Sequence, residues 1–332
     1  TRICEKGVLN KGVLDLLFNN MRGSEERIGD FNAMLGTGKK AEEHLQRLFK
    51  RFGGRELLEG VDALIERSER QMRGRVAECP DGDYYAEGYV ESDGTNPDPL
   101  AIRLKLTISG DSITADFTGT SAQTNGPTNC GPAMAFNAVG TIVKAFLDPR
   151  TPINHGSFNP ITVIAPEKSF INARETAPCG GMAEVKFLID SVVAAAMSQV
   201  VPEMSVGDLK GGANHVHIAG PRAGGGTWIH YEWPAGGTGA SAGTDGSNAV
   251  RSYNEGDFNS IQSVETVEAQ YPLRVERCEI RAGGCGDGAY RGGFGLRRDV
   301  RVLGDSAMLS VLSEKNVIPP YGVAGGSNGA AN

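Results

Sequence analysis

Glycine is unevenly distributed along this chain, and the distribution limits how the chain can fold. The sequence of 332 residues holds 46 glycines, and 25 of them lie between positions 207 and 329. The overall share is about twice the roughly 7% that is usual in proteins. Strand-like runs such as 227–231 and 273–280 alternate with the glycines. Because valine, isoleucine, tryptophan and tyrosine are interleaved, we expect tight turns between short strands rather than a slack linker.

The first part of the chain, residues 1–79, has a helical pattern. Ser24 is a suitable N-cap, and two glutamates follow it in the first turn, where the helix dipole favours acids. Apolar residues then recur at helical spacing, and two glycines, Gly53 and Gly54, end the predicted helix. Few residues here have side chains suited to catalysis. The segment is therefore predicted to serve packing or contact between subunits.

The middle part, residues 80–206, changes from a period of 3.6 to a period of 2. Alternating residues over 84–90, 102–108 and 113–117 predict a β-meander. Two helices follow, over about 132–147 and 184–201, each entered through a glycine-containing loop. The second is apolar on nearly every face, which predicts a buried central helix. With the glycine-rich and β-rich part 207–332, the sequence predicts an α+β fold.

Composition and charge exclude several classes of protein. The formal net charge is -7 and no basic tract stands out, so nucleic acid is not an expected partner. The best candidate for a membrane span, 187–201, is too short and contains Asp190, so no membrane is expected. None of the six cysteines is spaced as CxxC, which excludes a zinc ribbon. We expect reduced thiols and a cytoplasmic protein.

A series of short segments resembles the hydantoinase B/oxoprolinase family, which comprises B-type subunits of ATP-dependent hydantoinases, oxoprolinases and related carboxylases. The segments come in the family's order and cover nearly the whole chain. They are NNMR (19–22), EERIGD (25–30), DFTGTS (116–121), GPTNC (126–130), INHGSF (153–158), IAPE (164–167), APCGG (177–181), GGTGA (236–240), DG (245–246) and RGGFG (291–295).

This resemblance implies a function in a hetero-oligomer. An A-type, kinase-like partner would bind ATP and phosphorylate the carbonyl oxygen of a cyclic amide such as hydantoin, 5-oxoproline or a lactam. The B-type subunit would complete ring opening by water attack. The family's N-terminal region, which holds a divalent metal such as zinc or manganese, and its glycine-rich C-terminal tail are not matched here, so we expect a fragment, a processed piece or a split subunit. The alternatives are an ATP-dependent ketone carboxylase of the acetone or acetophenone type, and a non-catalytic structural piece.

Two loops that lead into the central helices are candidate anion sites. Free backbone N–H groups at a helix start favour a carboxylate, phosphate or oxyanion, whereas close packing at the junction explains the glycines as well. A thiolate nucleophile at Cys179 is less expected than a small buried cysteine, because no partner base is visible in the sequence. The predicted contact residues are Cys179, Gly180, Gly181, Asn129 and Cys130.

A second group of candidates surrounds the histidines. His215 and His217 are two residues apart, so a strand would place both rings on one face. We predict His215 and Glu232 as catalytic residues with polar roles. Zinc or manganese bound by the two histidines and Glu232 is a less favoured alternative. Further contacts with the substrate or an anion are predicted for Asn214, Gly236, Gly237 and Asp245.

Three other glycine motifs carry little functional signal. The pattern over 237–242 lacks the helix that a dinucleotide fingerprint needs, and 36–40 lacks the first glycine and the Ser/Thr of a P-loop. No kinase chemistry is therefore expected in this chain. The cluster formed by 281–288 and 291–293 is equally consistent with an anion-cradling loop and with tight β-turns.

Overall fold

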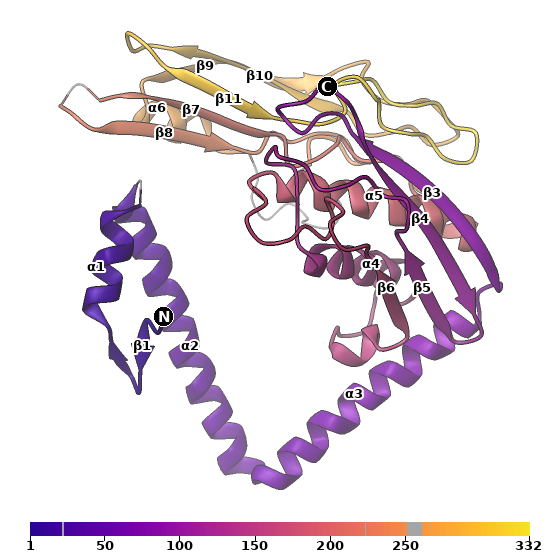
Figure 1. The fold of residues 1–332 in the computed structure, drawn as a ribbon. Helices are drawn as coiled ribbons and strands as arrows, with labels where there is room; N and C mark the ends of the chain where they lie inside the picture. Colours follow the sequence, from indigo (N-terminus) through magenta and orange to yellow (C-terminus); the bar gives the residue numbers. More distant parts are fainter. Residues whose placement is uncertain (22, 223, 251–260) are drawn as a thin grey trace. The chain divides into compact units, whose positions relative to one another are not determined.

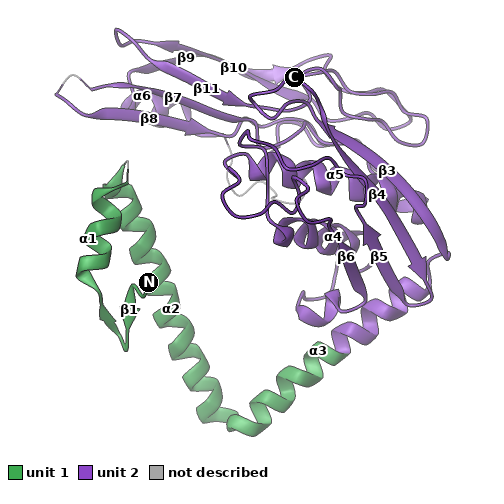
Figure 2. Cartoon of the chain, in the orientation of Figure 1, with its two compact units in different colours: residues 1–66 green, residues 67–332 purple. Residues whose placement is uncertain are grey.

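The computed structural model describes residues 1–21, 23–222, 224–250 and 261–332. Arg22, which belongs to the first of the family-like segments, lies outside the described residues. The chain divides into two compact units, residues 1–66 and 67–332 (Figure 2). Each unit is described by itself.

The first unit consists of a short hairpin and helices. Strands β1 (Cys4–Glu5) and β2 (Val8–Leu9) precede α1 (Lys11–Asn19), α2 (Ser24–Phe52) and α3 (Gly54–Ala77), the last of which continues into the second unit. Gly23, with φ +63°, is the N-cap of α2, so the prediction that Ser24 is the cap was wrong by one residue. No described residue of 1–66 is buried. Several apolar side chains are exposed, among them Met34, which is 65% exposed. This unit therefore has no hydrophobic core of its own among its described residues.

The second unit is built on a four-stranded sheet in the order β3-β4-β5-β6 (Figure 1). Strands β3 (Gly82–Val90), β4 (Leu100–Ser109) and β5 (Ser112–Asp116) form the predicted antiparallel meander. The fourth strand, β6 (Ile161–Ile164), pairs parallel to β5. A parallel pair needs a long crossover, which here contains helix α4.

Two helices form the hydrophobic core with this sheet. Helix α4 (Pro132–Leu147) starts with proline at its first turn, and α5 (Met182–Val200) packs on β3 and β4. Gly88 lets α5 come close, since a β-carbon there would lie 2.7 Å from Cγ2 of Val192. Short 3-10 helices η1 (His155–Phe158) and η2 (Pro202–Met204) follow α4 and α5. The prediction of a buried central helix is confirmed.

The glycine-rich part forms a second β region. Strands β7 (His215–Pro221), β8 (Thr227–Glu232) and β11 (Met308–Leu312) make a sheet in the order β11-β7-β8. Strands β9 (Leu273–Arg281) and β10 (Gly295–Val302) pair as an antiparallel ribbon, preceded by α6 (Val264–Gln270). A small core joins these elements through Ile218, Trp228, Val267 and Leu273. The α+β class is confirmed.

The glycines of this part allow backbone to pack against backbone. A β-carbon on Gly239 would lie 2.0 Å from the carbonyl oxygen of Gly207, and one on Gly237 would lie 1.9 Å from that of Gly293. Real side chains do not tolerate such distances. The turns are therefore tight, as the sequence predicts, and only glycine fits at these positions.

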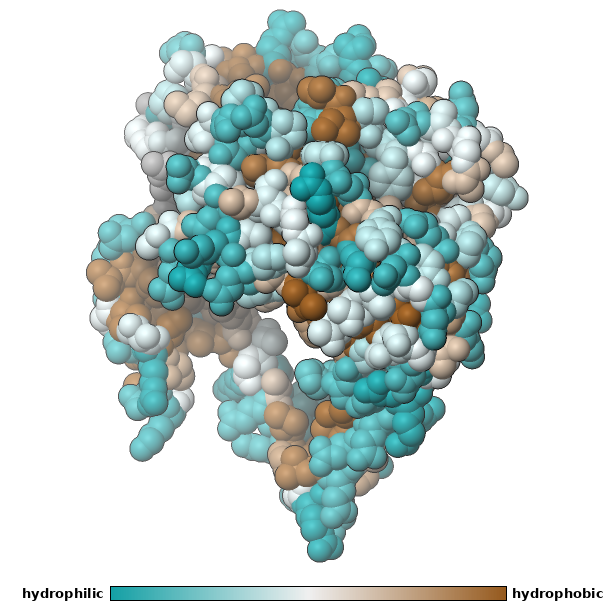
Figure 3. All heavy atoms as spheres, turned by 45° about the vertical axis from the view of Figure 1, so that its right-hand side comes forward, coloured by the Kyte–Doolittle hydropathy of each residue, from teal (hydrophilic) through white to brown (hydrophobic). Residues whose placement is uncertain are grey.

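Figure 3 shows one face of the molecule, where hydrophilic side chains predominate and apolar ones form separate patches. Among the described residues, no helix combines the length and the apolar character that a membrane crossing requires.

Candidate functional site at the start of helix α5

The two candidate anion loops lie against each other at the start of α5. Asn129 is fully buried, and its side-chain amide donates to the carbonyl oxygens of Gly126 at 3.0 Å and Pro178 at 2.9 Å. The N–H of Gly181 donates to the carbonyl of Pro127 at 2.9 Å. The sequence therefore identified two loops that do meet, and Asn129 and Gly181 hold them together.

The backbone donors at this junction are largely engaged. Besides Gly181, the N–H of Met182 donates to Cys179 at 3.2 Å and that of Glu184 donates to Gly181 at 3.1 Å. The expectation of free N–H groups is wrong for these three residues. Close packing explains the conformation of Gly181, whereas Gly180 is exposed beside it.

The two cysteines of these loops have opposite environments. Cys130 is buried, and burial raises the pKa of its thiol to about 12. Cys179 is exposed, so the expectation that it is a buried core residue was wrong. Its sulfur contacts the carbonyl of Ala177 at 3.5 Å. Of the pair, only Cys179 is accessible to a solute.

Glu184, in the first turn of α5, is a residue that the sequence analysis did not select. Its side chain is fully buried, and Oε1 accepts the N–H of Asn214 at 3.0 Å. Burial raises the pKa of its carboxyl to about 7. The available signal was an acidic residue in the first turn of a largely apolar helix, because such a residue is rarely buried without a function or a partner.

His215 lies next to Glu184, on the face of the sheet that the pattern predicted. Its Nε2 is 3.5 Å from Oε1 of Glu184, and its Nδ1 is 2.6 Å from the hydroxyl of Tyr231. His217 stacks on Tyr231 with ring centroids 4.4 Å apart. Trp233 completes this group, which we call the aromatic face: His215, His217, Tyr231 and Trp233.

The aromatic face also lies close to the candidate loops. Leu312 of β11 is paired with His215 of β7 in the sheet register. A β-carbon on Gly181 would lie 3.2 Å from Cδ2 of Leu312. The loop 177–181 and His215 are thus neighbours, separated by one leucine side chain. The structure brings these two predicted sites together.

Glu232 lies on the opposite face of the same sheet. It is paired in register with Val216, and its carboxylate forms an ion pair with Arg298 and lies 3.6 Å from Nε2 of His230. His215 and Glu232 are therefore not brought together. The alternative of a metal held by Glu232 and the two histidines does not fit this geometry. Across 1–21, 23–222, 224–250 and 261–332, no group of three or more His, Cys, Asp or Glu residues is arranged to hold a metal ion.

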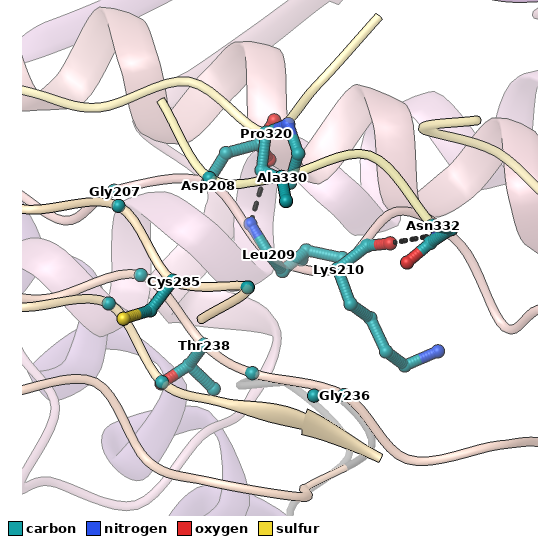
Figure 4. A pocket seen from close by; sticks show the side chains of 18 of the residues that line it. Gly207, Asp208, Leu209, Lys210, Gly236, Thr238, Cys285, Pro320, Ala330 and Asn332 are labelled. Carbon is teal, nitrogen blue, oxygen red and sulfur yellow. Dashed lines mark hydrogen bonds between the residues drawn. The ribbon is translucent and has the colours of Figure 1, made fainter. Parts of the chain in front are cut away.

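A cavity of about 330 Å³ is bounded in part by Val216 and Val311 of this sheet, and 12 of its 34 lining residues are glycines (Figure 4). Of the predicted residues, Asn214, Gly236 and Gly237 line it. The cluster 284–293 contributes to the wall, so it is at once a set of tight turns and part of a cavity. Asp245 is not in the lining, and its carboxylate instead accepts the N–H of Arg291 at 3.0 Å.

The segment between the cavity and Glu184 is fixed by buried polar contacts. Nζ of Lys210 donates to the carbonyl of Gly212 at 2.7 Å, and Lys315 pairs with Asp208 at 2.6 Å. The side-chain amide of Asn332 donates to the carbonyl of Lys210 at 2.8 Å, as the dashed line in Figure 4 shows. Asn214 follows this segment, with its N–H on Glu184 and its side-chain oxygen accepting the N–H of Glu314 at 3.3 Å.

A second buried carboxyl belongs to this region. Glu314 accepts the N–H of Glu91 at 2.9 Å, and burial raises its pKa to about 8. The negative charges of Glu91 and Glu184 act in the same direction. Glu184 and Glu314 also line a small cavity of about 10 Å³ beside α5. The start of α5 therefore carries two carboxyls whose pKa values burial raises to near neutral pH.

The chain is similar to proteins of known fold and name. The beta subunit of caprolactamase from Pseudomonas jessenii is 26% identical over 98% of this chain and 57% of its own length. The crystal structure of ATP-dependent caprolactamase from the same organism matches 95% of this chain and 55% of that chain, with a TM-score of 0.86 and 23% identity. Nucleotide-free acetone carboxylase matches all of this chain and 46% of its own, with a TM-score of 0.85 and 17% identity.

The chain thus spans little more than half the length of that caprolactamase subunit. At these identities the two solved structures establish the shared fold. The family model for hydantoinase B/oxoprolinase matches residues 1–332. With the ordered family-like segments and the fold in agreement, this chain belongs to the hydantoinase B/oxoprolinase family.

Proposed function

We propose that this chain is part of the B-type subunit of an ATP-dependent cyclic-amide hydrolase. The observation that carries the proposal is the family match over the whole chain, together with a relative that is named as a caprolactamase subunit. The chain spans about half of that relative, so the activity is assigned to the complete assembly. In that assembly an A-type partner binds ATP and phosphorylates the carbonyl oxygen of a hydantoin, 5-oxoproline or lactam ring.

The chemistry explains why two components are needed. A planar amide resists hydrolysis because its nitrogen delocalises its lone pair into the carbonyl. Phosphorylation of the oxygen converts the amide into an imidoyl phosphate, whose C=N carbon is open to attack by water. The second step then needs a base for the water and a proton for the leaving nitrogen. These are the groups that the B-type part has to supply.

The start of α5 is the place where this chain offers such groups. His215 lies at the aromatic face, and Leu312 separates it from Gly181 at the end of the loop that carries the exposed Cys179 and Gly180. The His215 ring also faces the carboxyl of Glu184, with 3.5 Å between Nε2 and Oε1. Glu232 is buried in its ion pair with Arg298 on the other face, so we assign the first catalytic role to His215.

The experiment uses the full-length protein copurified with its A-type partner. Hydantoin, 5-oxoproline and caprolactam are each incubated with the assembly and ATP, and the ring-opened acid and ADP are quantified by mass spectrometry. We expect ring opening that depends on ATP and on both subunits. Failure to open any of these rings, with ADP formed in each case only at the background rate, would contradict the proposal.

Ketone carboxylation is the second candidate, because the fold matches acetone carboxylase as well as it matches caprolactamase. The same assembly is therefore incubated with acetone or acetophenone, ATP and ¹³C-bicarbonate. Label in a β-keto acid, without ring opening of any amide, would assign the chain to the carboxylase instead. Ring opening without incorporation of label supports the hydrolase.

A further inference from the structure

Three side chains form a continuous line from the buried start of α5 to the exposed aromatic face. Oε1 of Glu184 lies 3.5 Å from Nε2 of His215, and Nδ1 of the same ring lies 2.6 Å from the hydroxyl of Tyr231. Exposure rises along the line: Glu184 is fully buried, the His215 side chain is 13% exposed, and Tyr231 is 45% exposed. The phenol is thus the end of the line that a solute can reach.

Proton transfer along this line requires one particular placement of the protons. The indole Nε1–H of Trp233 is a donor only, and it donates to the Tyr231 oxygen. The 2.6 Å contact between the Tyr231 oxygen and Nδ1 of His215 fits a hydrogen bond in either direction, and proton transfer along the line requires the one in which the hydroxyl donates to Nδ1. A neutral imidazole with an accepting Nδ1 carries its own proton on Nε2. That proton faces the carboxylate of Glu184.

Neighbouring groups hold these atoms in place. The ring of His217 stacks on Tyr231, and the ring of Trp233 lies edge-on to His215 with centroids 4.9 Å apart. Oε1 of Glu184 is anchored by the N–H of Asn214, one residue before His215. The carboxylate and the imidazole are therefore fixed by the same short segment of chain.

We infer that Glu184, His215 and Tyr231 form a proton relay in which Tyr231 is the group that contacts water or substrate. The order of groups follows triad logic, with a hydroxyl, an imidazole and a buried carboxylate. Glu184 acts through His215 and is a positioning residue. The inference deepens the proposed function, since it assigns the base that ring opening needs.

In the relay step, the oxygen of a water molecule forms a bond to the phosphorylated amide carbon, and the π electrons of its C=N bond move to the nitrogen, which takes up a proton from solvent. One proton of that water moves to the Tyr231 oxygen while the phenolic proton moves to Nδ1 of His215. The resulting imidazolium faces Glu184. When the ring C–N bond breaks, its electron pair stays on nitrogen, the proton returns through Tyr231 to that nitrogen, and the attacking oxygen releases its second proton to solvent as it forms a C=O bond. The product of this step is an acyl phosphate with a free amine, and a second water molecule cleaves the acyl phosphate into a carboxylate and inorganic phosphate. The relay ends as it began.

The first test is Tyr231→Phe in the full-length assembly. Phenylalanine keeps the ring that stacks on His217 and removes only the hydroxyl. General acid–base groups contribute about 10²–10⁴-fold to rate, so we expect kcat to fall at least about 100-fold with little change in KM. Tyr85→Phe is the matched control, because Tyr85 is a 63% exposed tyrosine on β3. It should leave kcat unchanged. Equal kcat values for Tyr231→Phe and wild type would contradict the proposed relay.

The second test reads the tautomer without any turnover. The protein is labelled with ¹⁵N-histidine, and His215 is assigned by comparison with His215→Gln. We expect the Nε2–H tautomer in wild type, and a loss of hydrogen bonding at Nδ1 in Tyr231→Phe. A proton on Nδ1 in wild type would overturn the relay, because Tyr231 could not then donate to that atom.

The third test addresses Glu184 as a positioning residue. Glu184→Gln keeps the shape and an acceptor oxygen for Asn214 but removes the negative charge. We expect kcat to fall at least about tenfold, and the acid limb of its pH profile to move to lower pH, because His215 loses the charge that favours its protonated form. A purely structural role would leave the pH profile in place, and that result would remove Glu184 from the relay.

The tests separate the two proposals. If the wild-type assembly opens no cyclic amide, the proposed function fails while the tautomer measurement still decides on the relay. If the wild-type assembly is active and Tyr231→Phe matches it, the relay fails alone.

Discussion

Gly239 lies against Gly207 so closely that a β-carbon on Gly239 would be 2.0 Å from the Gly207 carbonyl oxygen. Both residues line the 330 Å³ cavity, so its wall depends on two backbones in direct contact. An alanine at 239 can be accommodated only if one of these segments moves. The glycine content of this part of the chain is thus a packing requirement.

Gly239→Ala is expected to destabilise the protein. Overpacking by one methyl group typically costs about 1–3 kcal/mol, and contact with backbone rather than with a flexible side chain places the loss at the upper end. The free energy of unfolding is measured by urea denaturation followed by circular dichroism. Gly224→Ala is the control, because a β-carbon there meets no atom within 4 Å. Equal stability of the two variants would contradict the described packing.

Glu314 is expected to make stability depend on pH. Its pKa of about 8 in the folded state lies above the ordinary value near 4.5, so the folded state holds a proton that the unfolded state releases between these pH values. This contribution is complete below about pH 4 and is lost as pH rises towards 8, with a slope of at most about 1.4 kcal/mol per pH unit. Glu314→Gln should flatten the curve between pH 5 and 8, as measured by urea denaturation.

The matched control for that curve is Glu175→Gln, which changes an exposed glutamate in the same unit. It should leave the pH dependence as in wild type. A Glu314→Gln curve that runs parallel to wild type would show that Glu314 does not hold the proton.

Asn129→Ala is expected to separate the two loops at the start of α5. The buried amide donates to the carbonyls of Thr124, Gly126 and Pro178, and alanine leaves these acceptors without that donor. Each buried group that loses its partner costs about 1–3 kcal/mol, so the midpoint of thermal unfolding should fall clearly. Asn125→Ala, at an exposed position four residues earlier, should change it little. Similar midpoints for both variants would argue against a joining role.

Cys179 should react with iodoacetamide in the native protein, and Cys130 should not. Cys179 is exposed, whereas Cys130 is buried with a pKa raised to about 12, so little of it is thiolate. Peptide mapping by mass spectrometry after short exposure gives the labelled fraction of each. Both should be labelled after denaturation, which serves as the control. Labelling of native Cys130 at the rate of Cys179 would contradict the burial.

Much of the fold follows from local patterns in the sequence. The period-2 residues over 84–90 alternate between core and surface as expected, and proline at 132 begins a helix. The pairing of His215 with His217 on one face follows from strand geometry alone. These predictions succeeded because each depends on residues within a few positions of one another.

The relationship between His215 and Glu232 could not be predicted in the same way. It depends on the register of β7 and β8, in which Val216 lies opposite Glu232. A shift of one residue would have placed Glu232 on the face of His215. The contact of His215 with Glu184 depends on packing between α5 and a distant strand. Neither the register nor that packing is encoded in local spacing.

Strand β7 also divides its surroundings into two compartments. Its odd-numbered residues, His215 and His217, contact titratable and aromatic groups, whereas Val216 and Ile218 contact the cavity and a small apolar core. A substitution at Val216 or Ile218 therefore changes the cavity lining or the small core without replacing a side chain of the aromatic face. During evolution, Val216 and Ile218 can therefore change while His215 and His217 stay the same. The two histidines can likewise change while Val216 and Ile218 stay the same.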